Sequence, residues 1–348
     1  MREEVSVINE DRKLSIGFES RHYLIGNDGP KAFMKRLKSS IISLDLAHVR
    51  SVMLPFYDIG LFKNSDKSIY KKPYVLRADG IYFDKEEKLG SNEILNRPIY
   101  RSMDNACGIV YVSDFSKRLI ENFYKKINKP YAIIHNAVDI NKFRPDGDHC
   151  RQKIGISKDE RVIVASAHWR KWKRLEDIVK IFLEFIKEEK DKYRLLILGG
   201  DPDYVIKHEQ VHYIGEVKPS MLADWYRTGD IYIHLAWLEN CGNTQMEAMA
   251  CGLPVLCTNL GGIGETVKKA DGGIVSEADE PFNFSPVNLY DPPRPNHHII
   301  IKDLKKIFNN ISMYKNRILF KELSIGQAAL AYCGFLSEVF TRIKIETT

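Results

Sequence analysis

Short apolar runs alternate with longer amphipathic stretches throughout the second half of the chain. Runs of strand length occupy residues 161–166, 193–199 and 230–236, and apolar positions recur at helical spacing in residues 175–188 and 221–227. Such runs predict buried strands, and recurrence every three to four residues predicts amphipathic helices. Strands that alternate with helices build parallel, doubly wound sheets. This half is therefore predicted to be an α/β domain.

The first half shows the same alternation less regularly. Strand-like runs occupy 13–18 and 74–81, a turn at 26–31 opens into a helical pattern at 32–38, and 109–119 is a strand followed by a helix. Ser113 has the position and side chain of a helix cap in the last of these. Residues 39–73 mix short apolar and polar runs, so the pattern assigns them no element.

The chain length favours two domains. At 348 residues the chain exceeds what one ordinary core holds, and 44% hydrophobic residues argue against disorder. A polar stretch that begins at Asp146 marks the predicted boundary, so the expected domains are 1–146 and 147–322. Helical patterns at 302–314 and 323–345 end the chain, and residues 323–348 are predicted as a separate terminal helix.

The stretch from Glu239 to Glu247 carries the strongest candidate site. It follows a strand-like run, so Glu239 is expected in a loop at a strand's carboxyl end, where open parallel sheets bind ligands. Gly242 would let the backbone approach a ligand closely. The first amides of the next helix, near Asn243 and Thr244, are unpaired donors that suit a diphosphate. Two carboxylates would thus flank an anion site.

A capping box is the alternative explanation for Glu247. Thr244 and Glu247 have the spacing at which the two side chains satisfy the start of a helix. Capping would leave Glu239 without a role, whereas ligand binding uses both carboxylates.

A basic loop lies between the first strand and the first helix of the second domain. Residues 167–174 include four cations, among them Arg170 and Lys173, at the carboxyl end of a strand. Fixed cations there can offset the negative charge that grows on a diphosphate leaving group, as metals or Arg and Lys clamps do elsewhere. The alternative is a solvated loop with Trp169 and Trp172 packed beneath it.

The pattern around the two glutamates resembles a known signature. Glu-x7-Glu is followed by Ala-Met-Ala-Cys-Gly-Leu-Pro-Val, which resembles family 4 glycosyltransferases, retaining enzymes of the GT-B fold. The resemblance implies two Rossmann-like, doubly wound parallel-sheet domains that face a central cleft, with the last helix crossing back onto the first domain. It also implies transfer of a sugar from a UDP- or GDP-sugar to a hydroxyl of a glycan, glycolipid or glycoprotein.

The resemblance assigns roles within the second domain. Glu239 would contact the donor sugar near the reacting centre, and Glu247 would accept hydrogen bonds from the ribose hydroxyls. Arg170 and Lys173 would stabilise the departing diphosphate, and Lys173 matches the family's lysine. The strict register puts His168 where the family has arginine, so Arg170 is the expected substitute.

Two glycine-containing segments resemble parts of the family's donor site. Gly215 and Val217 belong to a segment like the loop that holds the nucleobase, largely through backbone atoms. Gly26 and Gly29 belong to a turn like the Gly-Gly-Pro loop, which faces the donor from the first domain.

Three residues are candidates on the acceptor side. Arg77 and Asp79 lie in a Leu-Arg-x-Asp-Gly segment found in some family members, and they would either face the acceptor or pair with each other. His48 would stand near the donor sugar, although a lone histidine is more often structural.

No metal or other cofactor is expected. Asp201-Pro-Asp203 imitates the Asp-x-Asp motif of the other glycosyltransferase fold, but a metal site needs more oxygen ligands than these two. The pair His297-His298 likewise lacks partners. Six cysteines lie far apart without a Cys-x-x-Cys pair, which argues against a zinc ribbon or a disulfide scaffold.

Charge and hydropathy limit which partners and which location are expected for this protein. Of a formal charge of +6, most falls on residues 1–150, which hold 25 Lys and Arg against 20 Asp and Glu. This excess could serve an anionic acceptor or a membrane surface, or could be a solvated face. No apolar run approaches the roughly 20 residues of a membrane span, and the first residues show no signal-peptide pattern. A cytoplasmic protein that binds no nucleic acid is expected, with peripheral membrane contact left open and no prediction of oligomeric state.

Three other functions compete. A GT-B epimerase of sugar nucleotides would share the two domains, but Glu-x7-Glu together with Lys173 fits a transferase better. A nicotinamide-dependent oxidoreductase would need Gly-x-Gly-x-x-Gly after a strand and an acidic residue about 20 positions later, and the sequence has no clean instance. The third is a catalytically inactive relative that binds carbohydrate or nucleotide, disabled by His168 and by Ala137, which replaces a hinge glycine.

Overall fold

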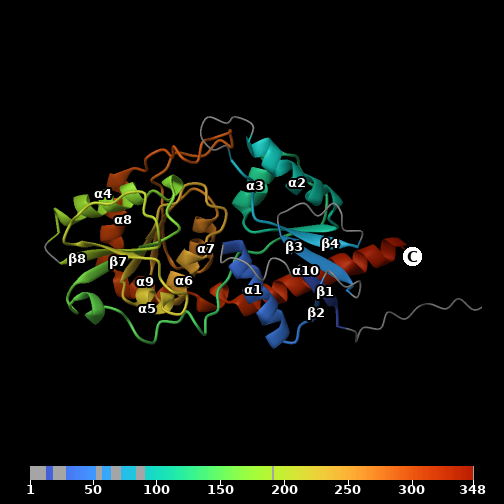
Figure 1. The fold of residues 1–348 in the computed structure, drawn as a ribbon, viewed down its shortest axis with the longest axis horizontal. Helices are drawn as coiled ribbons and strands as arrows, with labels where there is room; N and C mark the ends of the chain where they lie inside the picture. The colour runs from blue at the N-terminus through green and yellow to red at the C-terminus, as the bar shows by residue number, and fades with distance from the viewer. Residues whose placement is uncertain are drawn as a thin grey trace, which may run out of the picture.

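The computed structural model describes residues 13–18, 29–51, 57–63, 72–83, 91–189 and 192–347. These residues build two separate six-stranded sheets, and every pair of neighbouring strands is parallel (Figure 1). The predicted fold class of two doubly wound parallel-sheet domains is confirmed.

The first sheet has the strand order β2-β1-β3-β4-β5-β6. Its strands are β1 (Ser15–Phe18), β2 (His48–Ser51), β3 (Ile59–Lys63), β4 (Tyr74–Ala78), β5 (Gly108–Tyr111) and β6 (Tyr131–Ile133), with helices α1 (Gly29–Ser43), α2 (Ser91–Asn105) and α3 (Asp114–Phe123). The predicted cap Ser113 is confirmed, because its side chain accepts from the Ser116 amide. The pattern missed β2 and β3, since β2 is a partly exposed edge strand and Gly60 interrupts the short β3.

The second sheet has the order β12-β11-β10-β7-β8-β9. Its strands are β7 (Arg161–Ser166), β8 (Tyr193–Leu198), β9 (Val211–Gly215), β10 (Ile231–His234), β11 (Val255–Thr258) and β12 (Gly273–Ser276), with helices α4 (Leu175–Ile186), α5 (Leu222–Arg227), α6 (Thr244–Ala250), α7 (Ile263–Lys269), α8 (His297–Asn309) and α9 (Ile311–Arg317). The single helix predicted at 302–314 is two helices. Asn310 separates them with a φ of −131°, outside the helical range.

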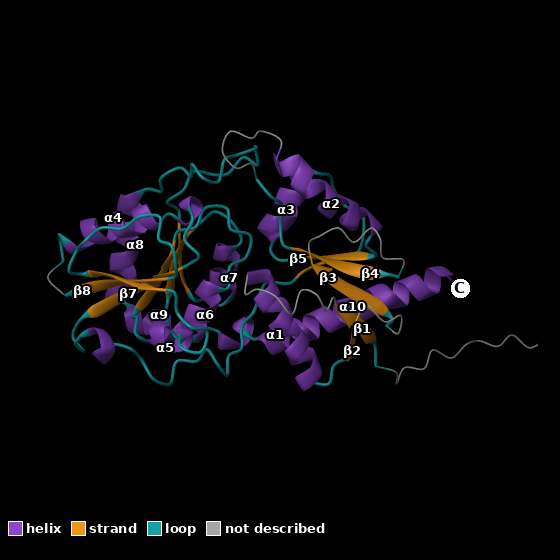
Figure 2. Ribbon diagram, in the orientation of Figure 1, coloured by secondary structure: helices purple, strands orange, loops and turns teal. Residues whose placement is uncertain are grey.

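The last helix, α10 (Ile325–Thr347), packs against α1 and completes the apolar core of the first sheet with Ala329, Tyr332 and Leu336 (Figure 2). The chain crosses between the sheets twice, and the crossings lie together. Val138 donates to the Leu323 carbonyl over 2.8 Å and accepts from the Ile325 amide over 2.8 Å. The predicted limit after residue 146 falls in the connection between β6 and β7.

Candidate functional site

Glu239 lies in the loop after β10, between a residue of strained backbone conformation and a glycine turn that packs on its carbonyl. The preceding Leu238 has a φ of 56°, a left-handed conformation that costs a non-glycine residue about 1–2 kcal/mol. The Gly262 amide donates to the Glu239 carbonyl over 2.8 Å. A Cβ at Gly261, whose φ is 85°, would lie 2.5 Å from that carbonyl oxygen, so only glycine fits beside it. The backbone at Glu239 is therefore tightly positioned.

Lys173 and His234 bind the same carboxylate oxygen of Glu239. Nζ of Lys173 lies 2.5 Å from Oε2, and Nε2 of His234 lies 2.9 Å from it. Burial alone would raise the pKa of the Glu239 carboxyl, but Lys173 and His234 outweigh burial and hold this pKa well below its usual range. The structure thus brings two predicted residues together and adds a third. His234 was missed because it lies inside an apolar run.

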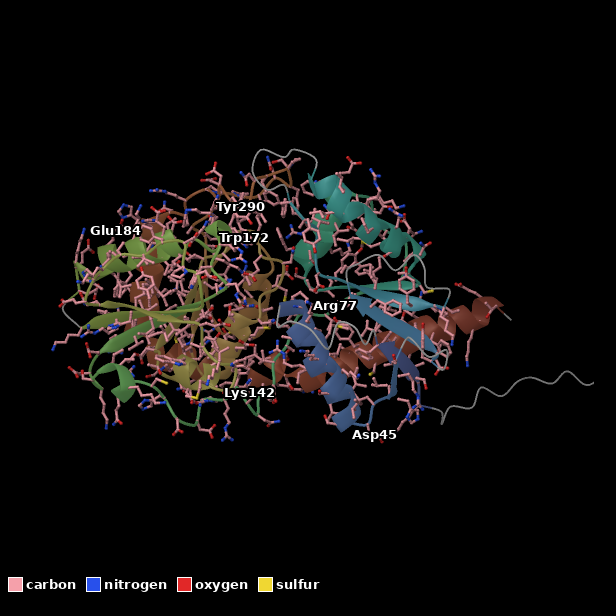
Figure 3. All side chains as sticks on the ribbon, in the orientation of Figure 1. Asp45, Arg77, Lys142, Trp172, Glu184 and Tyr290 are labelled. Carbon is pink, nitrogen blue, oxygen red and sulfur yellow. The ribbon has the colours of Figure 1, made fainter. Side chains whose placement is uncertain are left out.

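A buried ion pair anchors the loop that carries Lys173. Arg174 donates to the two carboxylate oxygens of Asp279 over 3.0 and 2.8 Å, and to the Pro293 carbonyl over 2.6 Å. Both charged side chains are almost fully buried. Next to Arg174, the Trp172 ring packs edge-on against Tyr290, with ring centres 5.2 Å apart (Figure 3). One of the four cations of the loop therefore serves as an anchor rather than as a ligand contact.

Arg170 and His168 stand apart from the Glu239 cluster. Both side chains are exposed, and Arg170 donates to the carbonyl of Trp169 over 3.0 Å. The Trp169 ring is buried, and its N–H donates to the Leu198 carbonyl over 3.1 Å. Arg170 therefore fits the alternative of a solvated loop packed above a tryptophan. Lys173 does not, because it is paired with Glu239.

Glu247 makes a contact between the two domains instead of capping its own helix. Asn243, not Thr244, takes the cap position of α6, and no side chain caps this helix. Oε1 of Glu247 accepts from Nη1 of Arg36 on α1 over 3.0 Å. Burial raises the pKa of the Glu247 carboxyl, although Arg36 opposes the shift. The capping-box alternative is therefore wrong, and the sequence held no signal that Arg36 would be the partner.

The glycine and asparagine candidates lie close to these carboxylates. Nδ2 of Asn243 donates to the Gly29 carbonyl over 3.1 Å, which joins two predicted residues across the domains. At Gly242, a Cβ would lie 2.6 Å from Oε1 of Gln245, so this side-chain end would have to shift to admit a larger residue. Gly26 lies outside the described residues.

Gly215 and Val217 lie at the far edge of the second sheet. Gly215 ends β9, three strands from β10, with a φ of 78°, and its carbonyl accepts from the Gly199 amide over 2.8 Å. Val217 packs partly against the apolar core. Within the described part of the chain, no hydrogen bond or ion pair joins these two residues to Glu239 or Glu247.

Arg77 and Asp79 pair with each other, as one of the two predicted alternatives had it. The Arg77 side chain is only 1% exposed, lies over the Phe33 ring, and donates to Oδ1 of Asn136 over 2.5 Å. Nδ2 of Asn136 donates in turn to the Cys241 carbonyl over 2.8 Å. A buried guanidinium thus links the end of β4 to the loop of Glu239.

His48 does not join the other candidates. It is exposed at the first position of the edge strand β2, opposite Ser15. The amino ends of parallel strands lie at the opposite edge of the sheet from the loops that carry Asp79. Its prediction as an acceptor-side residue is thereby corrected.

Glu265 ties the second domain to the helix start that Ser113 caps. Its carboxylate accepts from the amides of Asp114 and Phe115, each over 2.8 Å, and lies 3.0 Å from Nε2 of His135. Burial would raise the pKa of this carboxyl, but His135 and the two amides outweigh it and lower the pKa. The sequence held no signal for this contact, because its partners lie about 130 to 150 positions earlier in the chain.

The described residues offer neither a metal-binding cluster nor a membrane-spanning helix. That part of the chain holds no cluster of three or more His, Cys, Asp or Glu side chains with the spacing of a metal site. Asp201 and Asp203 are both exposed. Among the same residues, no helix combines the length and the apolar character needed to cross a membrane.

The part of the chain that carries Lys173, His234 and Glu239 matches a known family model. The family model described as Glycosyl transferases group 1 matches residues 147–285. N-acetyl-alpha-D-glucosaminyl L-malate synthase of Bacillus anthracis is 28% identical over 204 residues, which are 55% of this chain and 52% of that protein. D-inositol 3-phosphate glycosyltransferase 1 of Catenulispora acidiphila is 28% identical over 180 residues, 46% of this chain and 43% of its own. The chain spans about half the length of these curated relatives.

Solved structures share the fold over most of the chain. Sucrose-phosphate synthase from Thermosynechococcus elongatus aligns with a TM-score of 0.65 over 96% of this chain and 98% of its own, at 13% identity. Anabaena HepE, solved with UDP-glucose, aligns with a TM-score of 0.65 over 93% and 100%, at 17% identity. At such identities the likeness shows the fold alone. Residues 147–285 of this chain are therefore similar to the group 1 glycosyl transferases, and they lie within a two-domain fold of the GT-B type.

Proposed function

We propose that the chain is a retaining glycosyltransferase that moves a sugar from a nucleotide sugar to a hydroxyl of a glycan, glycolipid or glycoprotein. The ion pair of Lys173 and Glu239 carries the proposal, because it stands at the carboxyl ends of the neighbouring strands β7 and β10 within the matched region. The name of the glycosyltransferase relative supports sugar transfer, and the UDP-glucose complex of HepE supports a nucleotide sugar as the donor.

The proposed reaction takes place at the anomeric carbon. The acceptor oxygen attacks this carbon, the bond to the diphosphate breaks, and the hydroxyl proton moves to the departing diphosphate on the same face. Lys173 stabilises the charge that develops on the diphosphate. Glu239 contacts the sugar, and its ionised carboxylate favours the positive charge that grows there.

A ligand screen followed by a turnover assay tests the proposal. Thermal unfolding with UDP, GDP, ADP and their sugars should show a rise in melting temperature for one nucleotide class, since a ligand of the folded state stabilises it. The best donor should then be hydrolysed slowly without acceptor. Binding without hydrolysis or transfer would favour the inactive relative, and a changed sugar still bound to nucleotide would favour the epimerase.

Glu247→Gln is expected to weaken donor and free nucleotide alike, by about 10- to 100-fold. Loss of a hydrogen bond to a charged group costs about 1.5–3 kcal/mol, and both ligands carry the ribose. The donor KM should therefore rise more than kcat falls. Calorimetric titration with the nucleoside diphosphate measures this, with Glu338→Gln on the exposed face of α10 as the control. Unchanged nucleotide affinity in Glu247→Gln would refute the ribose assignment.

Removal of divalent metal is expected to leave the rate nearly unchanged, because Lys173 supplies the positive charge next to the leaving group. Initial rates with and without EDTA measure this. A loss of rate that Mn²⁺ or Mg²⁺ restores would instead assign a metal to the reaction.

A further inference from the structure

The two oxygens of the Glu239 carboxylate have different surroundings. Oε2 lies against both Lys173 and His234. Oε1 lies toward Gly242, where an added Cβ would be 3.3 Å from it. Within the described residues, no hydrogen bond or ion pair involves Oε1. One oxygen is therefore anchored, and the other is directed toward the start of α6.

His234 provides the more rigid of the two anchors. It ends β10, a strand inside the sheet, and pairs in register with Cys257 of β11. Its side chain is 5% exposed, and its ring stacks on Tyr232 with centres 6.1 Å apart. A carboxylate oxygen only accepts hydrogen bonds, so Nε2 of His234 must carry the proton that it donates. Lys173, in contrast, lies outside the sheet in the short helix Lys171–Lys173 and reaches Oε2 through a flexible side chain.

The proposed reaction requires Lys173 to serve two partners. In this structure its ammonium is paired with Glu239, yet the departing diphosphate needs the same charge. A turn of the ammonium toward the diphosphate would loosen its hold on Oε2. A second donor fixed on the sheet would then keep the carboxylate in place, as outer hydrogen bonds do for other reactive groups.

We infer that His234 is a positioning residue, which holds Oε2 of Glu239 so that Oε1 stays aimed at the donor sugar while Lys173 turns to the leaving group. This inference rests on the proposed function. The role of His234 is thereby separate from nucleotide binding. In the described contacts, its imidazole touches neither Glu247, the carboxylate proposed to bind the ribose, nor Arg36.

The test compares His234→Leu with His234→Gln, whose amide nitrogen can replace the Nε2 donor. The donor is whichever of UDP-glucose, UDP-N-acetylglucosamine, GDP-mannose and ADP-glucose gives the largest thermal shift, and hydrolysis is measured without acceptor. We expect His234→Leu to lower kcat about 10-fold or more, with nucleoside diphosphate affinity within about twofold of wild type. His234→Gln should recover most of kcat. His149→Leu, an exposed histidine in the connecting segment, is the control.

Each outcome decides the inference. Equal kcat in wild type and both variants would overturn it, and so would a loss of nucleotide affinity in both, since that would indicate a packing role. If His234→Leu does not fold, His234→Asn takes its place, because its shorter amide cannot reach Oε2 and should lose kcat while His234→Gln keeps it. Absence of nucleotide binding and turnover in the wild-type protein would refute the proposed function as well, whereas wild-type turnover with unaffected variants would refute the role of His234 alone.

Discussion

Lys173→Ala is expected to slow sugar transfer by about 10²-fold or more. Removal of one preorganised donor from a site that stabilises developing negative charge has an effect of this size. Lys173 is the cation that the structure places on Glu239, and its side chain is 15% exposed. Steady-state kinetics with a saturating donor measure the effect. Lys171→Ala is the matched control, because Lys171 lies in the same short helix, Lys171–Lys173, with an exposed side chain.

Companion variants assign the loss to the right partner. Arg170→Ala beside His168→Ala shows which residue, if either, fills the position of the family's arginine. Glu239→Gln should lower kcat steeply and leave free nucleotide affinity almost unchanged, because free nucleotide has no sugar. Lys173→Ala combined with Glu239→Gln should lose less than the product of the two single losses, since the residues share one ion pair. Full activity of Lys173→Ala would show that Lys173 does not stabilise the leaving group.

Asp279→Asn is expected to lower the free energy of unfolding by about 3–5 kcal/mol. This change leaves the Arg174 guanidinium charged and uncompensated in the interior, and such broken pairs have costs of this order. The carboxylate otherwise accepts two hydrogen bonds from Arg174. Urea-induced unfolding followed by circular dichroism measures the difference.

A second ion pair with the same two-bond geometry is the control for this prediction. Arg317 donates twice to Asp271, each over 2.7 Å, but both side chains are exposed. Asp271→Asn should therefore leave stability nearly unchanged, because exposed ion pairs contribute little. The double replacement Arg174→Met with Asp279→Leu should recover part of the loss, since it removes both buried charges. Equal effects of Asp279→Asn and Asp271→Asn would contradict the anchoring role of the buried pair.

Local pattern explains why the second domain was the more predictable half. Its strands at 161–166 and 193–198 are buried almost throughout, so each appears as an unbroken apolar run. The strands β2 and β3 were missed because each has at most five residues, and one of them alternates exposed and half-buried positions. Short elements of this kind are held by their neighbours in the sheet, and sequence spacing does not show those neighbours.

The candidate site, too, has features that local sequence predicts and features that only the tertiary structure shows. Glu239 and Lys173 could each be placed at the end of a strand, because that placement depends only on which strand precedes them. Their pairing depends on the sheet order, in which β7 and β10 are neighbours although their first residues, Arg161 and Ile231, are 70 positions apart. The partners His234 and Arg36 gave no signal in the sequence, since one lies in an apolar run and the other on a helix of the opposite domain.

The sequence by itself determined the alternation of strands and helices, the Ser113 cap and the residue types at the strand ends, because these depend on neighbours within a few positions along the chain. The tertiary structure decided which charges meet. It buried Arg174 on Asp279, exposed Arg170, turned Glu247 from its helix start to Arg36, and moved His48 away from the other candidates. The physical reason is that burial and long-range pairing set the charge and orientation of a side chain, and both depend on residues far away in the sequence.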